Sequence, residues 1–355
     1  MVNEQPPLSS VFLHSGFRSG STWFWSKFRQ SESSHSYYEP FNEVLAELQA
    51  DEIVNNKSDA WASGHPKLEQ PYYEEFRSLI RLEGGVSGFH PDMPYALYYN
   101  GAAHQPQQDY IEGLARHARE AGKIPVFGFC RSYARVPWLR RYCGGRHIVT
   151  LRNPKDQWAS YRTQHEKHDN AYFHFKTYMI ATIGWHGKVY SGFFDGLPFT
   201  DLLQVAASER AETLYAYFLT LGAAERCRVF LRVFALDMLV ALPQADVVVD
   251  LDELSANPAY RGDVTTHLRA LTGLADLSFE DCALPHSEAE DSAWTMAVKQ
   301  ELHFLDRFFL THQPGTGASR VIAIVKAMLR GETFAIAERH QREPDRAAAR
   351  VARRG

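Results

Sequence analysis

Short apolar runs alternate with longer segments of mixed polarity along the chain, and the first run sets the pattern. Residues 11–15 (VFLHS) form an apolar run that leads into a turn bounded by glycines at residues 16–20. Residues 21–29 then open with small hydroxyl side chains, which are favoured where a helix begins. This succession predicts a β-strand, a tight turn and an α-helix, in that order.

The same succession recurs further along the chain. Apolar runs rich in β-branched residues predict strands at residues 124–129 (IPVFGF), 147–151 (HIVTL) and 246–250 (DVVVD). Helices are predicted from residue 155 onward and at residues 201–221, 223–242 and 259–271. Strands that are apolar throughout and alternate with helices are typical of a parallel sheet covered on both faces. We therefore expect a doubly wound α/β fold in three layers.

Two stretches lack this regular pattern. Residues 55–110 are rich in Pro, Gly, His and Tyr, which predicts long ordered loops or a lid. We expect one domain over residues 1–338 with a loop-rich insertion at residues 46–123. Residues 339–355 hold six arginines and form a basic tail, which we interpret as a solvated helix or frayed end, with an arm for nucleic acid or membrane as the alternative.

The charge balance narrows the range of partners. The 355 residues carry 38 Lys and Arg against 42 Asp and Glu, a formal net charge of −4. A protein that binds nucleic acid mainly through its phosphates needs a basic surface, so we expect no nucleic-acid partner. The chain is 45% hydrophobic yet holds no run of eighteen apolar residues, so we expect a folded protein without a membrane span.

The cysteines and the first residues bear on the cellular compartment. The four cysteines form no CxxC pair, which argues against a zinc site and against thioredoxin-like redox chemistry. The first ten residues contain no Lys or Arg, so we expect neither a signal peptide nor a membrane anchor there. A cytoplasmic protein with reduced thiols is the resulting expectation.

The turn after the first strand carries the most specific chemistry. Residues 16–22 (GFRSGST) place backbone N–H groups and the positive end of a helix dipole where they can bind an anion, and Arg18 adds a cation inside the turn. The loop is one residue shorter than the Walker A pattern GxxxxGK[ST] and lacks its lysine. A nucleoside-triphosphate kinase with Mg²⁺ is therefore not the first expectation.

This loop resembles that of the sulfotransferases that use 3′-phosphoadenosine 5′-phosphosulfate (PAPS) as donor. Their loop has the form (K/R)-S-G-(S/T)-T-W, and residues 18–23 (RSGSTW) match each position, with the arginine typical of the carbohydrate and tyrosyl-protein branches. A second family motif, R-(D/N)-P-(R/K)-D-x-W-x-S, is matched by residues 152–160 (RNPKDQWAS). The resemblance covers residues 10–45 and 124–275 and implies a P-loop-type parallel β-sheet flanked by helices.

The resemblance also implies a role for each matched residue. The residues implied to bind PAPS are Gly16, Phe17, Arg18, Ser19, Gly20, Ser21, Thr22, Trp23, Arg152 and Ser160. The first loop would hold the 5′-phosphosulfate, and Arg152 with Ser160 would bind the 3′-phosphate. For Trp23, packing in the core is favoured over contact with the nucleotide. A sulfuryl group carries less negative charge than a γ-phosphoryl group, so fixed cations and amides can stabilise its transfer and we expect no metal ligands.

A base must take the proton of the acceptor as it attacks sulfur. Glu39 is the main candidate, because the resembling tyrosyl and carbohydrate enzymes use a Glu about twenty residues past the loop cation, and Glu39 follows Arg18 by 21 residues. A purely structural Glu39 is the alternative. His90 is the second candidate, since the small-molecule branch uses a histidine from this part of the chain.

We therefore expect an enzyme that transfers a sulfuryl group from PAPS to an acceptor hydroxyl and releases 3′,5′-adenosine bisphosphate. A saccharide acceptor is favoured, because aromatic loops at residues 61–110 suit sugar rings. The alternatives are a sulfotransferase for small alcohols or phenols, a P-loop kinase and an inactive nucleotide-binding protein. The exact acceptor, the adenine-binding loop and the oligomeric state stay open.

Overall fold

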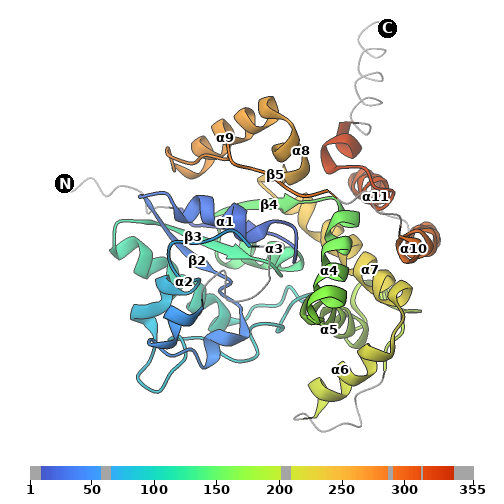
Figure 1. The fold of residues 1–355 in the computed structure, drawn as a ribbon, viewed down its shortest axis with the longest axis horizontal. Coiled ribbons are helices and arrows are strands. Elements are labelled where there is room, and N and C mark those ends of the chain that lie inside the picture. The colour runs from blue at the N-terminus through green and yellow to red at the C-terminus, as the bar shows by residue number, and fades with distance from the viewer. Residues whose placement is uncertain (1–8, 57–64, 201–208, 287–290, 313–314, 340–355) are drawn as a thin grey trace, which may run out of the picture. The chain divides into compact units, whose positions relative to one another are not determined.

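A computed structural model of the chain describes residues 9–56, 65–200, 209–286, 291–312 and 315–339. The chain forms two compact units. The first comprises Met1–Leu151 and Gln244–Leu284, and the second comprises Arg152–Pro243 and Pro285–Gly355. Figure 1 labels the helices and strands. The phosphate loop predicted after the first strand belongs to the first unit.

The first unit is built around a five-stranded parallel sheet. The strands are β1 (Val11–His14), β2 (Ser34–Tyr38), β3 (Ile124–Phe129), β4 (Arg146–Leu151) and β5 (Val247–Asp250). They lie in the order β2-β3-β1-β4-β5, and every neighbouring pair is parallel. In the central strand, Leu13 lies opposite Gly128 on one side and Ile148 on the other. The loop after β1 therefore starts at the middle of the carboxyl edge of the sheet.

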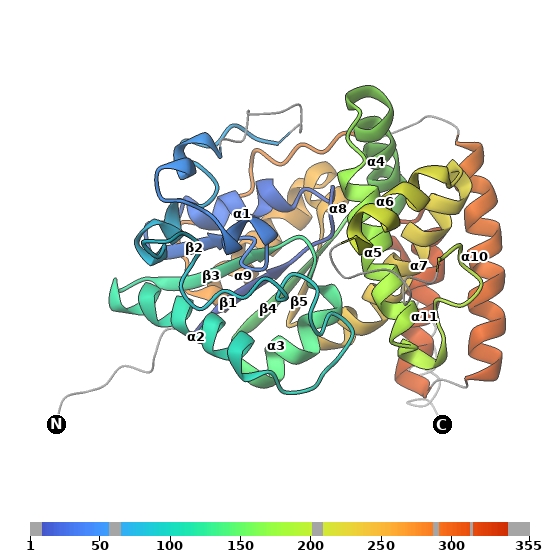
Figure 2. The same ribbon diagram turned by 90° about the horizontal axis from the view of Figure 1, so that it is seen from below.

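Helices cover both faces of this sheet. They are α1 (Ser21–Arg29), α2 (Gln105–Glu120), α3 (Val136–Tyr142), α8 (Leu251–Ala256) and α9 (Pro258–Thr272). Figure 2 shows α1, α8 and α9 on one face and α2 and α3 on the other. Trp25 of α1 packs so closely on Gly128 that a methyl group there would lie 2.5 Å from its ring. On the opposite face, the Tyr37 hydroxyl donates to the Leu114 carbonyl of α2 at 2.9 Å. The predicted α/β class, with a parallel sheet between helices, is confirmed.

The predicted strands match the observed ones, but the sequence pattern missed β2. The β2 sequence SHSYY contains no aliphatic residue, and its first two residues are only partly buried. β2 lies at the edge of the sheet, beside β3 alone. An edge strand needs less apolar surface than a central one, so its composition does not stand out from the surrounding polar residues.

The insertion predicted at residues 46–123 belongs to the first unit and is more regular than expected. Short 3₁₀ turns occur near and within it: η1 (Glu43–Ala46), η2 (Glu52–Asn55) and η3 (Glu74–Leu79). The 16-residue helix α2 begins at Gln105, inside the stretch predicted as loops up to residue 110, and fills most of the rest of the insertion. A further turn, η4 (Tyr133–Arg135), leads into α3. Pro106 stands in the first turn of α2, where its missing N–H costs no hydrogen bond.

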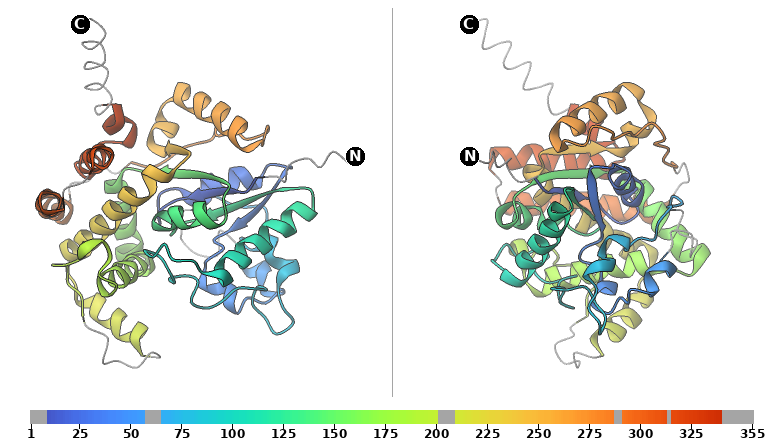
Figure 3. Two further views of the ribbon diagram at one scale, coloured as in Figure 1. Left: turned by 180° about the vertical axis from the view of Figure 1, so that it is seen from behind. Right: turned by 90° about the vertical axis from the view of Figure 1, so that its left-hand side faces the viewer.

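The second unit consists of helices in its described residues (Figure 3). They are α4 (Pro154–His168), α5 (Tyr172–His186), α6 (Arg210–Thr220), α7 (Ala223–Ala241), α10 (Ser292–Thr311) and α11 (Thr316–Leu329), with a short turn η5 (Val189–Ser191) after α5. α7 contacts α4, α5, α10 and α11, and every residue from Val229 to Met238 is buried. Its buried Arg232 pairs with Glu301 of α10 at 2.5 Å, so the central helix is held by an ion pair as well as by apolar contacts.

Parts of three predictions fall outside the described residues. These are residues 57–64 of the loop-rich insertion predicted at 46–123, residues 201–208 of the helix predicted at 201–221 and residues 340–355 of the arginine-rich tail. The described part of that helix, α6, begins at Arg210. Among the described helices, none has the length and apolar character needed to cross a bilayer.

Candidate active site

In open parallel α/β sheets, ligands bind at the carboxyl ends of the strands, at the topological switch point. This is the place where two neighbouring strands are connected onward to opposite sides of the sheet. That point lies between β1 and β4, because β2 and β3 follow on one side of β1 and β5 follows on the other side of β4. The Ser15 and Thr150 hydroxyls meet there at 2.6 Å. The loop of residues 16–20 thus starts at the switch point of the sheet.

This loop is a tight turn with a strained residue at its centre. The backbone N–H and the hydroxyl of Ser19 both donate to the Gly16 carbonyl, at 3.4 and 2.8 Å. Arg18 (φ 59°) and Gly20 (φ 96°) are left-handed. Glycine adopts this conformation freely, whereas arginine does so at a cost of about 1–2 kcal/mol. Strain of this kind gathers at functional sites, which supports the hypothesis that Arg18 has a role beyond folding.

Helix α1 begins directly after this loop, at Ser21. The first helical hydrogen bond runs from the Phe24 N–H to the Gly20 carbonyl at 3.0 Å. The N–H groups of Ser21, Thr22 and Trp23 come before it and have no acceptor within the helix. No acidic side chain in the first turn offsets the positive end of the helix dipole. The loop and helix together are suited to bind an anion.

The hydroxyls of the first turn are tied to the ends of neighbouring strands. The Ser21 hydroxyl donates to the Cys130 sulfur at 3.4 Å, directly after β3. The Thr22 hydroxyl lies 3.0 Å from the Tyr38 hydroxyl at the end of β2. These contacts fix the first turn of α1 against the carboxyl edge of the sheet.

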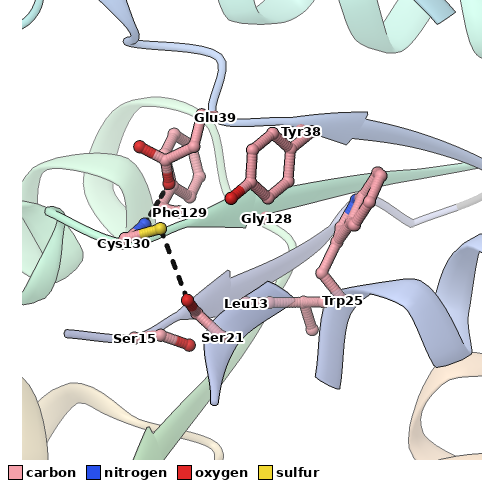
Figure 4. Close-up of a pocket in the computed structure, with 9 residues that line it drawn as sticks. All are labelled: Leu13, Ser15, Ser21, Trp25, Tyr38, Glu39, Gly128, Phe129 and Cys130. Atoms are coloured by element: carbon pink, nitrogen blue, oxygen red, sulfur yellow. Dashed lines mark hydrogen bonds between the residues drawn. The ribbon is translucent and has the colours of Figure 1, made fainter. Parts of the chain in front are cut away.

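Glu39 faces the same turn from the end of β2. Its backbone is left-handed (φ 46°), and its N–H donates to the Gly128 carbonyl at 2.7 Å. Its side chain is 4% exposed and accepts a hydrogen bond from the Cys130 N–H. Glu39 and Ser21 line one tight crevice and contact Cys130 from opposite sides (Figure 4). The structure thus brings the predicted base beside the predicted donor-binding turn.

A buried cation lies behind Glu39. Arg131 is 2% exposed, and its Nε lies 3.7 Å from Oε2 of Glu39. Its two terminal nitrogens donate to the two carboxylate oxygens of Glu43, at 2.9 and 2.6 Å. The Tyr95 hydroxyl donates to the same Glu43 carboxylate at 2.5 Å. Glu39 and Glu43 therefore share one guanidinium, which holds two carboxylates close together without strong repulsion.

The surroundings of Glu39 set its proton affinity. Burial raises the pKa of the Glu39 carboxyl above its ordinary value, while Arg131 and the Cys130 N–H act against that rise. A carboxylate with a raised pKa is a stronger base near neutral pH than an exposed one. Burial also raises the pKa of the Cys130 thiol, so Cys130 is a neutral hydrogen-bonding group and not a thiolate nucleophile.

Two residues of the PAPS-binding set predicted in the first loop, Trp23 and Phe17, pack against other side chains. Trp23 is partly buried against the apolar core, with its ring 6.1 Å from that of Phe279. The Phe17 side chain is buried, and the guanidinium of Arg131 lies 5.7 Å from its ring centre. The contact to Phe279 agrees with core packing for Trp23, while its predicted contact to the donor stays a prediction.

The second motif lies in the second unit. Asn153 caps α4 by accepting from the Lys155 N–H at 2.9 Å, and Arg152 directly precedes this cap. The Arg152 side chain is 6% exposed and donates to the Pro285 carbonyl. Ser160 lies partly exposed on α4, two turns further along. Trp158 is buried and donates to Asp291 at 2.8 Å, so it packs in the core.

His90 lies in a different place from Glu39. It is exposed and lines a groove of about 520 Å³ formed with α2, whose walls include Asp109, Arg116 and His117. None of the residues that line the crevice around Glu39 lines this groove. The structure therefore does not bring His90 together with Glu39.

Two residues near the loop were missed by the sequence pattern. Arg131 follows the strand β3 at a distance of two residues, and a cation at the carboxyl end of a predicted parallel strand is a signal that could have found it. His65 lies 3.4 Å from Arg18, but 47 residues separate the two in sequence. No local pattern marks such a contact.

Comparison with known proteins adds no relative. No protein-family model, no curated protein and no solved structure matches this chain. The function must therefore be argued from the residues and from the geometry of the site.

Proposed function

We propose that this protein is a sulfotransferase that moves a sulfuryl group from PAPS to an acceptor hydroxyl. The observation that supports the proposal best is that Ser21, at the start of a helix suited to bind an anion, and Glu39, a buried carboxylate, both contact Cys130 and so lie close together. Transfer of an anionic group to a hydroxyl needs a base beside an anion site. The two motifs at residues 18–23 and 152–160 support PAPS as the donor.

In the proposed reaction, the acceptor oxygen forms a bond to sulfur as the bond between sulfur and the bridging oxygen of PAPS breaks. Glu39 takes the proton of the acceptor hydroxyl, and 3′,5′-adenosine bisphosphate leaves. Arg18 and the N–H groups at the start of α1 offset the negative charge on the departing phosphate. The raised pKa of Glu39 suits proton transfer near neutral pH.

Arg152 and Ser160 are proposed to bind the 3′-phosphate of the donor, which ATP lacks. This assignment rests on the second sequence motif. The hydrogen bond from Arg152 to the Pro285 carbonyl supports it, because a guanidinium held by the protein binds a phosphate without first losing its freedom.

Calorimetry with two nucleotides tests the donor. We expect 3′,5′-adenosine bisphosphate to bind without Mg²⁺, and ATP with Mg²⁺ to bind far more weakly. Arg152→Ala should lower the affinity for the bisphosphate and leave the weak affinity for ATP unchanged. Tight, Mg²⁺-dependent binding of ATP with none of the bisphosphate would instead identify a P-loop kinase.

Transfer of labelled sulfate from PAPS tests the reaction. We propose a saccharide hydroxyl as the acceptor and expect transfer to neutral oligosaccharides with undiminished rate in the presence of a chelator. Transfer only to small alcohols or phenols would identify the small-molecule alternative. Binding of the bisphosphate without any transfer across both acceptor classes would mean an inactive nucleotide-binding protein.

We propose a cytoplasmic location for this reaction. All four cysteines, Cys130, Cys143, Cys227 and Cys282, are free thiols. Thiols stay reduced in the cytoplasm, whereas oxidising compartments favour disulfides. Cell fractionation with an antibody to the chain checks the location.

A further inference from the structure

A histidine from the segment between β2 and β3 reaches back to the phosphate loop. His65 Nε2 lies 3.4 Å from Nη1 of Arg18. A guanidinium N–H can only donate, so the imidazole nitrogen must accept, and His65 must be neutral with its proton on Nδ1. The histidine is therefore a hydrogen-bond acceptor for the cation of the loop.

The other side of the imidazole is also held. His65 Nδ1 lies 2.8 Å from the Tyr72 hydroxyl, which accepts the Nδ1 proton. Tyr72 is 7% exposed and stacks on Tyr38, with ring centres 4.7 Å apart. Since the Tyr38 hydroxyl lies 3.0 Å from that of Thr22, the contacts lead from Arg18 through the insertion back to α1.

The surroundings keep this histidine neutral. Burial and the nearby Arg18 lower the pKa of His65 to about 4. At neutral pH the imidazole thus presents a lone pair to the guanidinium and never a like charge. The Tyr72 contact selects the tautomer that does so.

We infer that His65 is a positioning residue that fixes the direction of the Arg18 guanidinium, with Tyr72 holding His65 in turn. The inference rests on the proposed function, in which Arg18 offsets charge on the departing phosphate. An arginine has a long, flexible side chain, and a cation that is already oriented stabilises a transition state without reorganising during the reaction.

Steady-state kinetics of three variants test the role. We expect His65→Ala to lower kcat by about 10- to 100-fold, because a displaced cation mainly affects the transition state, while the KM for PAPS changes little. His65→Gln should regain most of the rate, since its amide oxygen can take the place of Nε2. The kcat of Tyr72→Phe should lie between those of His65→Ala and His65→Gln. A loss that His65→Gln does not restore, or that appears only in KM, would contradict the inference.

A double-mutant cycle separates positioning from a merely structural role. If His65 acts through Arg18, adding His65→Ala to Arg18→Ala should cause no further loss of kcat. Losses that multiply would show that His65 acts independently and would overturn the inference. Thermal unfolding of each variant identifies any that fail to fold, and the glutamine variant then carries the test.

A titration of His65 by NMR does not depend on activity. We expect its pKa to be near 4 in the wild type and higher in Arg18→Ala, because the neighbouring positive charge is removed. If the wild type transfers no sulfate, yet the pKa of His65 still rises in Arg18→Ala, the proposed function is wrong while the contact between His65 and Arg18 is confirmed. If His65 titrates at the ordinary value in both proteins, the positioning inference is wrong whatever the activity.

Discussion

Arg18 and Glu39 are the two side chains on which the proposed chemistry depends, and both have backbones that L-residues rarely adopt. Their φ angles are 59° and 46°. The sequence motif located Arg18, and the spacing of 21 residues located Glu39. Their conformations, and the pairing of Glu39 with Arg131, could not be predicted, because they depend on contacts between segments far apart in sequence.

Glu39→Gln should lower kcat by about 10²- to 10⁴-fold, the usual contribution of a general base. The amide keeps the size of the side chain and removes the proton acceptor. Rates with saturating PAPS check this, and Glu47→Gln, at an exposed position of the same segment, is the matched control. Near-normal turnover in Glu39→Gln would mean that another group is the base.

Arg131 should help to set the pH at which Glu39 loses its proton and can act as the base. The acidic limb of kcat/KM reports deprotonation of the base, and the positive charge of Arg131 lowers the pKa of Glu39. Arg131→Met removes that charge, so the limb should move to higher pH, whereas Arg131→Lys should move it less. An unchanged limb in a folded Arg131→Met enzyme would show that Arg131 does not tune the base. If Arg131→Met does not fold, the position of the acidic limb in Arg131→Lys tests the prediction instead.

At the scale of elements, strands β1 and β4 are joined by two buried histidines. His14 Nε2 lies 3.0 Å from His147 Nδ1, and both rings are fully buried. His14 Nδ1 accepts from the Ser132 hydroxyl at 2.7 Å, and His147 Nε2 donates to the Gly144 carbonyl at 2.9 Å. Each ring is satisfied as a neutral imidazole, so an added proton would lose a hydrogen bond.

These histidines should make stability depend on pH. Burial lowers the pKa of His147 to about 4 and also lowers that of His14, so the unfolded chain binds more protons between about pH 6.5 and 4. Stability should fall as the pH drops through this window, by up to about 1.4 kcal/mol per pH unit for each histidine. Urea unfolding at several pH values measures the slope. His147→Gln should reduce it, and His267→Gln on the exposed side of α9 should not.

Two glycines give opposite predictions for the elements that contain them. In Gly128→Ala the new methyl group would lie 2.5 Å from the ring of Trp25, so β3 and α1 must separate, at a cost of about 1–3 kcal/mol. In Gly113→Ala on α2 nothing lies closer than 3.9 Å, and the helix should gain about 0.5–1 kcal/mol. Thermal unfolding of both variants checks the pair. Equal melting temperatures would contradict this packing of α1 on the sheet.

The elements were predictable to different degrees. The strands at residues 124–129 and 246–250 were predictable because a covered parallel sheet requires nearly continuous apolar runs. β2 was not, since an edge strand made of Ser, His and Tyr has no such run. α2 was hidden by its polar sequence, which contains Pro106 and Gly113 among few apolar positions.

At the scale of the whole molecule, the chain forms two compact units, while the single domain predicted over residues 1–338 stays a prediction. The division follows the packing and not the order of the chain, since each unit is made of separated segments. Hydrophobic periodicity describes single elements and says little about which elements pack together. The net charge of −4 was likewise silent about the site, where Arg18 and Arg131 are placed individually.

Donor product should stabilise the whole chain. A ligand that binds only the folded protein adds about 2.7 kcal/mol at a concentration of 100 times its Kd. We therefore expect 3′,5′-adenosine bisphosphate to raise the melting temperature, and Arg18→Ala and Arg152→Ala each to reduce that rise. Differential scanning fluorimetry measures it, with adenosine as the control ligand. An equal rise with adenosine would indicate that the phosphates are not recognised.

The left-handed backbones at Arg18 and Glu39 have a consequence for protein engineering. Glycine adopts such a conformation freely, and asparagine does so more easily than other side chains. A library randomised at these two positions and screened only for heat resistance should therefore enrich glycine and asparagine, and should discard the cation and the base together. Improving the durability of this protein without losing its chemistry requires that both codons be kept fixed while the rest of the chain is varied.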